Sequence, residues 1–159
     1  MRILSIFNKK DEAFLRQKTE EVKDPTDPEI RKLVEAMNDT MKKNNGVGLA
    51  ANQIGKSWRI FIAEHQNQFY TFINPRIIKH SRKVVLGEEG CLSVPYIVGI
   101  VPRYEKIVIE GRDLNNNKIK IKASGTLARI FQHENDHLDG IVFIDKAKEL
   151  YQVKSAKND

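Results

Sequence analysis

Two histidines four residues apart constrain the fold more than any other part of the sequence. The stretch reads His133-Glu134-Asn135-Asp136-His137 in a chain of 159 residues. On a helix, side chains four residues apart lie on one face, so both imidazoles can reach the same divalent metal ion. Phe131 and Leu138 flank the pair and indicate that the helix is buried. The rest of the chain must therefore build a core around a helix that carries polar, potentially ligating side chains.

The residue that follows the first histidine adds a second chemical function. Glu134 lies beside His133 and can reach a water molecule on the metal ion without being a ligand, which is the H-E-x-x-H arrangement. The chain has 4 histidines, and two of them are in this motif. The alternative is a pair of surface histidines on an exposed helix face.

A catalytic metal site of this kind needs a third protein ligand and one open position. Downstream of the helix the candidates are the acids Asp139, Asp145 and Glu149. The other candidate is Cys91, the one cysteine, which excludes an internal disulfide and favours a reducing compartment. A lone cysteine is more often a small buried apolar residue. As a ligand its thiolate would suit Fe(II), zinc, nickel or cobalt.

A glycine-rich segment, residues 45–55, is the third candidate functional region. Gly46-Val47-Gly48-Leu49-Ala50-Ala51 fits a relaxed dinucleotide-binding fingerprint, but a helix precedes it where a strand is required. We therefore expect the glycines to allow close approach of the backbone to another group. Gln53 is either an amide donor in the site or a loop residue that faces water.

Composition indicates a globular chain with a weakly informative charge. Hydrophobic residues make up 40% and charged residues 30%, and 27 basic against 21 acidic residues give a net charge of +6. The charges are mixed along the chain, which indicates a mildly basic surface, or at most a weak attraction to a polyanion, and no specific nucleic-acid site. The start lacks a signal peptide and no stretch of about 20 apolar residues exists, so we expect a cytoplasmic protein with no membrane partner.

The pattern of elements predicts one α+β domain over residues 1–159, with antiparallel or mixed sheets packed around the helix that carries H-E-x-x-H. An earlier helix is expected from the cap Asp27 and Pro28 to about Lys43. A short helix is expected at the C-terminal end, over 145–153. The expected strands are 58–63, 68–73 (ended by Asn74-Pro75), 97–101, 106–110 and 118–122, and Ser124 is expected to cap the central helix.

Three segments together resemble the peptide deformylase family, whose members remove the formyl group from nascent polypeptides. The family motifs G-x-G-L-A-A-x-Q, E-G-C-L-S and Q-H-E-x-D-H are matched by residues 46–53, 89–93 and 132–137. The resemblance implies metal ligation by Cys91, His133 and His137, with Fe(II) as the physiological metal ion and zinc, nickel or cobalt as possible replacements.

The resemblance also implies roles for residues around the metal ion. Glu134 would act as the general acid and base, and Gln53 with the backbone N–H of Leu92 would bind the formyl oxygen. By analogy with the family, the substrate backbone would pair as an added strand with residues around Val47 and Gly48 and with the segment before Cys91, which includes Gly90. The methionine side chain needs an apolar pocket, and the candidates, chosen because they lie near the motifs, are Val47, Leu92, the stem of Arg129 and Ile130.

The implied partners are the nascent formylated polypeptide and, through the short tail 146–159, transiently the ribosome, in a bacterial cytosol or an organelle of bacterial origin. Two other functions compete with this interpretation. A zincin-type metallopeptidase would also use H-E-x-x-H but would give Cys91 no role. A non-catalytic metal- or polyanion-binding module would not hydrolyse anything. Neither alternative explains the other two motifs together.

Overall fold

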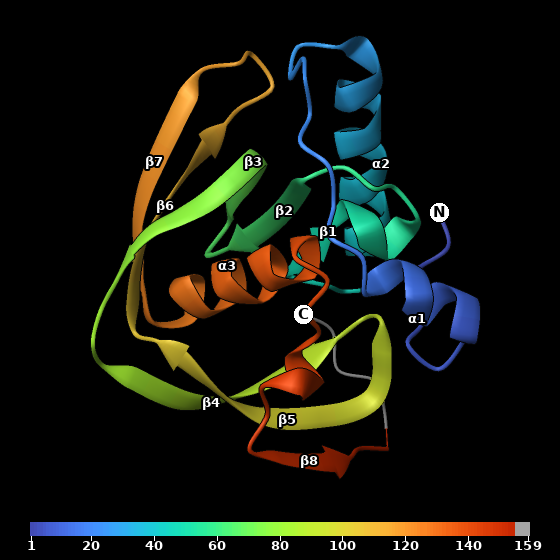
Figure 1. Ribbon diagram of the computed structural model, residues 1–159, viewed down its shortest axis with the longest axis vertical. Coiled ribbons are helices and arrows are strands. Elements are labelled where there is room, and N and C mark those ends of the chain that lie inside the picture. Colours follow the sequence, from blue (N-terminus) through green and yellow to red (C-terminus); the bar gives the residue numbers. More distant parts are fainter. Residues whose placement is uncertain (155–159) are drawn as a thin grey trace.

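The computed structural model of the chain describes residues 1–154 and shows two antiparallel sheets on either side of one helix, α3 (Figure 1). The helices are α1 (Lys9–Leu15), α2 (Pro28–Lys43) and α3 (Gly125–Leu138), and the two 3-10 turns are η1 (Ala51–Ile54) and η2 (Phe143–Asp145). The strands are β1 (Gly48–Ala50), β2 (Ile60–His65), β3 (Gln68–His80), β4 (Val84–Cys91), β5 (Val94–Tyr104), β6 (Lys106–Arg112), β7 (Lys118–Ser124) and β8 (Glu149–Gln152).

The larger sheet has five strands in the order β1-β2-β3-β6-β7, and the smaller has three in the order β4-β5-β8. In Figure 1 the helix α3 runs between the two sheets, while α1 and α2 lie at the side near β1. The expected α+β fold with the H-E-x-x-H helix at its centre is confirmed. Among the described residues no helix is both long and apolar enough to span a bilayer.

The helix α2 forms where its sequence signals place it. Asp27 accepts a hydrogen bond from the backbone N–H of Glu29 at 2.9 Å, and Pro28 occupies the first turn, where its missing N–H costs nothing. Met37 and Met41 are fully buried in the core beneath β1 and β2. These two methionines fill core volume, as the spacing of apolar residues predicts.

The helix α3 is held in place by an aromatic cluster under its apolar face. The Phe131 ring lies 5.1 Å from the Phe72 ring and 5.9 Å from the Phe61 ring, centroid to centroid. Ser124 precedes the helix at the expected position, but its side chain makes no capping hydrogen bond. Gly140 follows the helix with φ +74°, and a Cβ there would lie 2.6 Å from the carbonyl carbon of Arg16, so the stop requires glycine.

The strand β3 corrects one expectation, because it continues through Asn74-Pro75 to His80. Its pairing with β6 shifts register between Ile73 and Arg76, so Pro75 lies in a bulge where no ladder N–H is required. Asn74 adopts φ +54° there. In β7 the expected alternation is confirmed, since its lysines are exposed and its isoleucines are half-buried.

The helix expected over 145–153 is wrong, and a strand takes its place. The Asp145 carboxylate accepts a hydrogen bond from the Val142 N–H at 3.0 Å and closes η2, so it does not start a helix. The following residues form β8, which pairs with β5 from Ile97↔Gln152 to Ile100↔Glu149. The backbone of β5 offers this segment hydrogen-bond partners that its own sequence pattern does not reveal.

Candidate active site and metal centre

The two sheets bring Cys91, at the end of β4, against the histidines of α3. One ligand atom from each of Cys91, His133 and His137 lies within 4.8 Å of the others. The Cys91 Sγ atom is 3.3 Å from His137 Nε2, and all three residues are at most 4% exposed. The alternative of two surface histidines on an exposed helix face is therefore wrong, and the cysteine and the two histidines face one point.

The donor set fits a divalent metal ion. Tetrahedral coordination with typical Zn–S and Zn–N bonds would place sulfur and nitrogen ligands about 3.6 Å apart, close to the observed 3.3 Å. His133 donates its Nδ1–H to Glu89 Oε1 at 2.8 Å, which directs Nε2 toward the cluster. Within the described chain, His133 Nε2 is buried without a hydrogen-bond partner. A metal ion would satisfy that nitrogen.

The charges around His137 favour its ligating form. Burial lowers the pKa of His137, and the nearby positive charges of His133 and Arg103 lower it further. The imidazole is therefore neutral at pH 7 and has a lone pair to offer a metal ion. The pKa of His133 is raised because Cys91 and Glu89, despite burial, favour a positive charge on this ring, and a metal ion would supply that charge.

A buried network of charges holds the His133 side chain, and the sequence did not reveal it. Arg103 donates to both oxygens of Glu89, from Nε and Nη2 at 2.8 Å each, and its Nη1 donates to Asp136 at 2.6 Å. Arg129 adds a third cationic contact to Glu89 at 2.7 Å. Burial raises the pKa of Glu89, but the hydrogen bonds from Arg103 and His133 outweigh it and hold that pKa well below the usual range.

The same network keeps Arg103 charged inside the protein. Burial lowers the pKa of Arg103, but its bidentate hydrogen bonds with Glu89 and its pairing with Asp136 raise it above its ordinary value. Lys146 reaches Asp136 at 2.9 Å from the other side. Glu89 and Asp136 both lie inside the family motifs, so their positions in the sequence could have indicated a role in the site. Arg103 lies outside every motif.

Glu134 lies beside the ligand cluster, and Gly48 makes room for it. The Glu134 Oε1 atom is 4.0 Å from His133 Nε2, and the residue is 1% exposed. A Cβ atom added at Gly48 would lie 2.8 Å from the Glu134 Cδ atom, which is too close. The expectation that a glycine of this segment permits close approach to another group is confirmed, and the group is the Glu134 carboxylate.

Gln53 is fully buried and its amide is oriented by the backbone. Its Oε1 accepts the N–H of Ala50 at 2.9 Å, so its Nε2 faces Ser93 Oγ at 3.1 Å and Cys91 Sγ at 3.4 Å. The alternative of a loop glutamine that faces water is therefore wrong. Asn52 donates to the backbone oxygen of His137 at 2.6 Å and joins this segment to α3.

The remaining predicted residues are spread around this centre. Gly90 is buried next to Cys91, and Leu92 packs against the core near Gly46, where an added Cβ would meet its Cδ1 at 3.0 Å. The carbonyl oxygen of Val47 accepts the N–H of Glu64 at 2.8 Å.

Two candidates for the substrate pocket make structural contacts. The Arg129 guanidinium binds the backbone oxygens of Val85 and Val101 at 2.8 Å each, and so joins β4 to β5. Ile130 is half-buried and packs against the aromatic core. Arg129 reaches the Cys91 cluster indirectly, through its contact with Glu89 at 2.7 Å, whereas the contacts of Ile130 are with the aromatic core.

The three downstream acids considered as ligands are engaged elsewhere. Asp139 pairs with Arg59 at 2.8 Å, Asp145 pairs with Arg16, and Glu149 lies exposed in β8. The cluster that the structure assembles uses Cys91 instead. A buried Cys/His/His set with a carboxylate beside it is typical of a mononuclear metal hydrolase.

Comparison with known proteins gives the family. A family model described as polypeptide deformylase matches residues 3–153. The peptide deformylase of Symbiobacterium thermophilum is 46% identical over 96% of this chain and 70% of its own length. That of Thermodesulfovibrio yellowstonii is 41% identical over 97% of each chain. The chain belongs to the polypeptide deformylase family and is an enzyme of that family.

Solved structures of the family have the same fold. The crystal structure of peptide deformylase from Thermotoga maritima superposes with a TM-score of 0.87 at 34% identity, covering 93% of this chain and 97% of that one. A peptide deformylase from Synechococcus elongatus in complex with actinonin gives 0.87 at 31% identity, covering 94% and 79%.

Proposed function

We propose that this enzyme hydrolyses the N-formyl group from formylmethionine at the start of nascent polypeptides and releases formate. The observation that carries the proposal is the convergence of Cys91, His133 and His137 with the Glu134 carboxylate and the Gln53 amide in one buried centre. Cys91, His133 and His137 would hold one divalent ion, for which we propose Fe(II), with zinc, nickel or cobalt as substitutes. The thiolate makes the set soft enough for each of them.

Glu134 would handle the protons of the reaction. When bound, a divalent ion lowers the pKa of a water molecule towards about 7 and polarises a carbonyl group. Glu134, whose Oε1 atom is 4.0 Å from His133 Nε2, would take the proton from that water and later give it to the leaving amine. Because Gly48 has no side chain, the Glu134 carboxylate can lie close to the backbone of β1 without steric hindrance.

Gln53 and the backbone N–H of Leu92 would stabilise the negative charge that grows on the formyl oxygen. The Gln53 amide is held in place by Ala50 and Ser93, and its second N–H, which faces the Cys91 Sγ atom at 3.4 Å, is the one that would turn to the formyl oxygen. Leu92 follows Cys91 directly in the turn between β4 and β5, which fixes its N–H near the metal ligand. Each donor of this type typically contributes about 10²–10³ in rate.

The substrate backbone would bind between two outer strands. β1 and β4 are each terminal in the described strand orders, so each has one edge that a peptide can extend. Val47 and Gly48 would contribute from the β1 side, and Gly90 from the β4 side. Ile130 and the stem of Arg129 are proposed to line the pocket for the methionine side chain.

The proposed partners follow from this substrate. The enzyme would encounter a formylated chain as the ribosome synthesises it. We therefore propose a transient association with the ribosome, in a bacterial cytosol or an organelle of bacterial origin. The tail suggested for this contact ends in residues 155–159, which lie outside the described residues. Within the described part of the tail, the last element is the strand β8 and not a helix.

Release of formate from formyl-Met-Ala-Ser tests the proposal. The assay should use protein loaded with nickel or cobalt, or handled anaerobically with Fe(II), with the acetylated peptide and an unblocked peptide as controls. We expect formate from the formylated peptide alone. Correctly metallated protein that releases no formate, or that cleaves internal peptide bonds instead, would contradict the proposal and favour the metallopeptidase alternative.

A further inference from the structure

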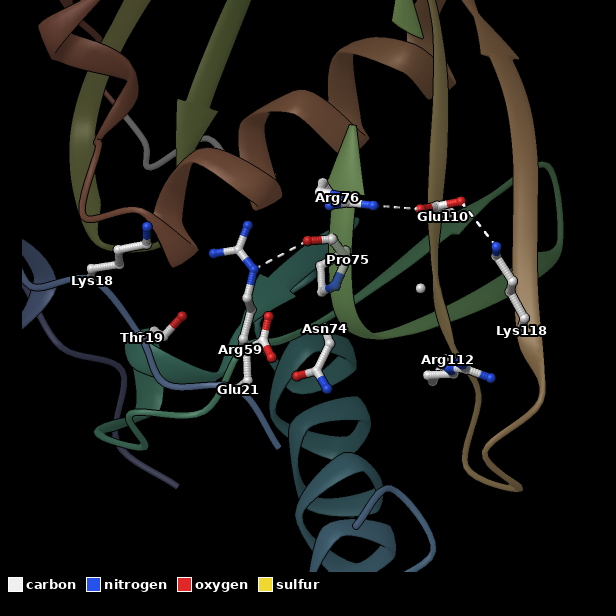
Figure 2. Close-up of a pocket in the computed structure, with 11 residues that line it drawn as sticks. Lys18, Thr19, Glu21, Arg59, Asn74, Pro75, Arg76, Glu110, Arg112 and Lys118 are labelled. Atoms are coloured by element: carbon white, nitrogen blue, oxygen red, sulfur yellow. Dashed lines mark hydrogen bonds and ion pairs between the residues drawn. The ribbon is translucent and has the colours of Figure 1, made fainter. Parts of the chain in front are cut away.

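A cavity of about 520 Å³ lies away from the metal centre, and neither Cys91 nor the two α3 histidines line it. Figure 2 shows it between the bulge of β3, the start of β2, the segment that includes Lys18 and the β6–β7 hairpin. Its volume is within the usual range for small-molecule sites, about 300–1,000 Å³. The deformylase reaction described above uses none of its lining residues.

The lining of this cavity is strongly basic. Five cationic side chains face it against two carboxylates, those of Glu21 and Glu110. The cationic residues are Lys18, Arg59, Arg76, Arg112 and Lys118. Arg76 and Lys118 share Glu110, at 3.0 and 3.6 Å (Figure 2). No ion pair among the described residues includes Lys18 or Arg112, although Arg112 donates one hydrogen bond to the Asn116 carbonyl oxygen at 3.3 Å. These two positive charges are therefore not balanced by a carboxylate.

The floor of the cavity is rigid and already formed. Asn74 bonds Val22 in both directions, accepting its N–H at 2.8 Å and donating to its carbonyl at 2.9 Å. Arg59 donates to the Pro75 carbonyl oxygen at 3.1 Å, as Figure 2 shows, and to Asp139 at 2.8 Å. A ligand that enters here would not have to order the chain before binding, which lowers the entropic cost of binding.

The chemistry of the lining indicates the kind of ligand. Three of the five cations are arginines, whose planar forks match the oxygens of phosphate. Arg59 and Arg76 already pair with Asp139 and Glu110, so Arg112 is the arginine whose charge has no carboxylate beside it among the described residues. No aromatic ring lines the cavity within the described residues, so no side chain there can stack on a base. We propose that this cavity binds a small anion that carries two or more phosphate groups.

Pyrophosphate is the probe for this proposal. Zinc-loaded enzyme labelled with ¹⁵N would be titrated at constant ionic strength and followed by NMR. We expect saturable shifts at residues 74–76 and 110–112, at the cavity. Arg112→Gln combined with Lys118→Gln should weaken binding about tenfold or more, since two charge-assisted contacts are removed. Lys18→Gln, on the opposite rim, should weaken binding independently.

Arg82→Gln combined with Lys10→Gln is the matched control, since both residues are exposed, lie outside this cavity and change the net charge equally. It should change the affinity by less than about twofold. Circular dichroism would show that every variant is folded, and formate release should stay at the wild-type rate. The proposal is overturned by an absence of saturable shifts, by shifts confined to the metal centre, by equal loss in the control, or by citrate or single-stranded RNA binding as well as pyrophosphate.

Discussion

Two groups of ion pairs in this molecule use the same residue types in opposite surroundings. Beneath the cluster of Cys91, His133 and His137, Glu89 pairs with Arg103, and both side chains are at most 3% exposed. On the five-stranded sheet, Glu110 pairs with Arg76 and Lys118, whose side chains are 75% and 63% exposed. Water screens the outer group, whereas the inner group depends entirely on its own hydrogen bonds.

The difference shows where the fold requires its charges. The inner group connects β4, β5 and α3 and orients His133 through Glu89, so its geometry is transmitted to the candidate metal site. The outer group holds cations around a cavity and orients no ligating side chain. A buried pair is costly to break because the remaining charge has no solvent, and an exposed pair is not.

The largest expected effect comes from removing the inner carboxylate. Glu89→Ala leaves Arg103 buried without its bidentate partner, which should lower the free energy of unfolding by about 3–5 kcal/mol. His133 also loses the acceptor for its Nδ1–H, so metal affinity should fall about 10–100-fold. Urea unfolding and metal titration measure the two effects. Near-wild-type values in both would show that the inner network is dispensable.

A smaller effect is expected from adding one methyl group at Gly48, next to the Glu134 carboxylate. In Gly48→Ala the new Cβ atom would collide with the Glu134 carboxylate and displace it. A displacement of about 1 Å in a catalytic group can cost about 10²-fold in rate, so kcat should fall by about that factor. Metal content should stay at the wild-type level, because neither residue is proposed as a ligand. Unchanged turnover would remove Glu134 from its proposed role.

The dependence of stability on acidic pH is the next expected difference between the two groups of ion pairs. The pKa of Glu89 is lowered in the folded protein, so its ionised form stabilises the fold above the usual glutamate pKa of about 4.5, and this stability is lost as the pH falls below that value. With the metal ion removed by chelation, wild-type stability should therefore fall steeply below that pH. Glu89→Gln should show a shallower decline. Parallel curves for the two proteins would contradict the assigned direction.

The smallest expected effect comes from the outer group. The hydrogen bond from Arg76 lowers the pKa of Glu110, but this pair is exposed to water. Glu110→Gln should change the free energy of unfolding far less than Glu89→Ala does, and the change should shrink further at high salt. A loss as large as that of Glu89→Ala would erase the distinction between the two groups.

Local signals in the sequence were enough to locate α2 and α3. The Asp27 cap and the apolar spacing define α2, and the H-E-x-x-H pattern places two ligating residues one turn apart on α3. The cluster with Cys91 also follows from motifs, although the two parts are more than 40 residues apart.

Contacts between residues on different strands could not be predicted from local sequence signals. Arg103 reaches Glu89 because β4 and β5 form a hairpin, and nothing local to Arg103 marks it as a partner. The strand β8 exists because β5 has an edge to offer, while its own sequence is equally compatible with a short helix. Helix α1 has only 7 residues, too few for a clear apolar period.

We propose that Glu134 moves protons at a metal ion held by Cys91, His133 and His137. The most direct measurement compares formate release by wild-type protein and Glu134→Gln at equal, measured metal content. We predict that the variant binds metal as the wild type does and turns over about 10²–10⁴-fold more slowly. A variant that keeps wild-type turnover, or that loses its metal, would contradict this assignment.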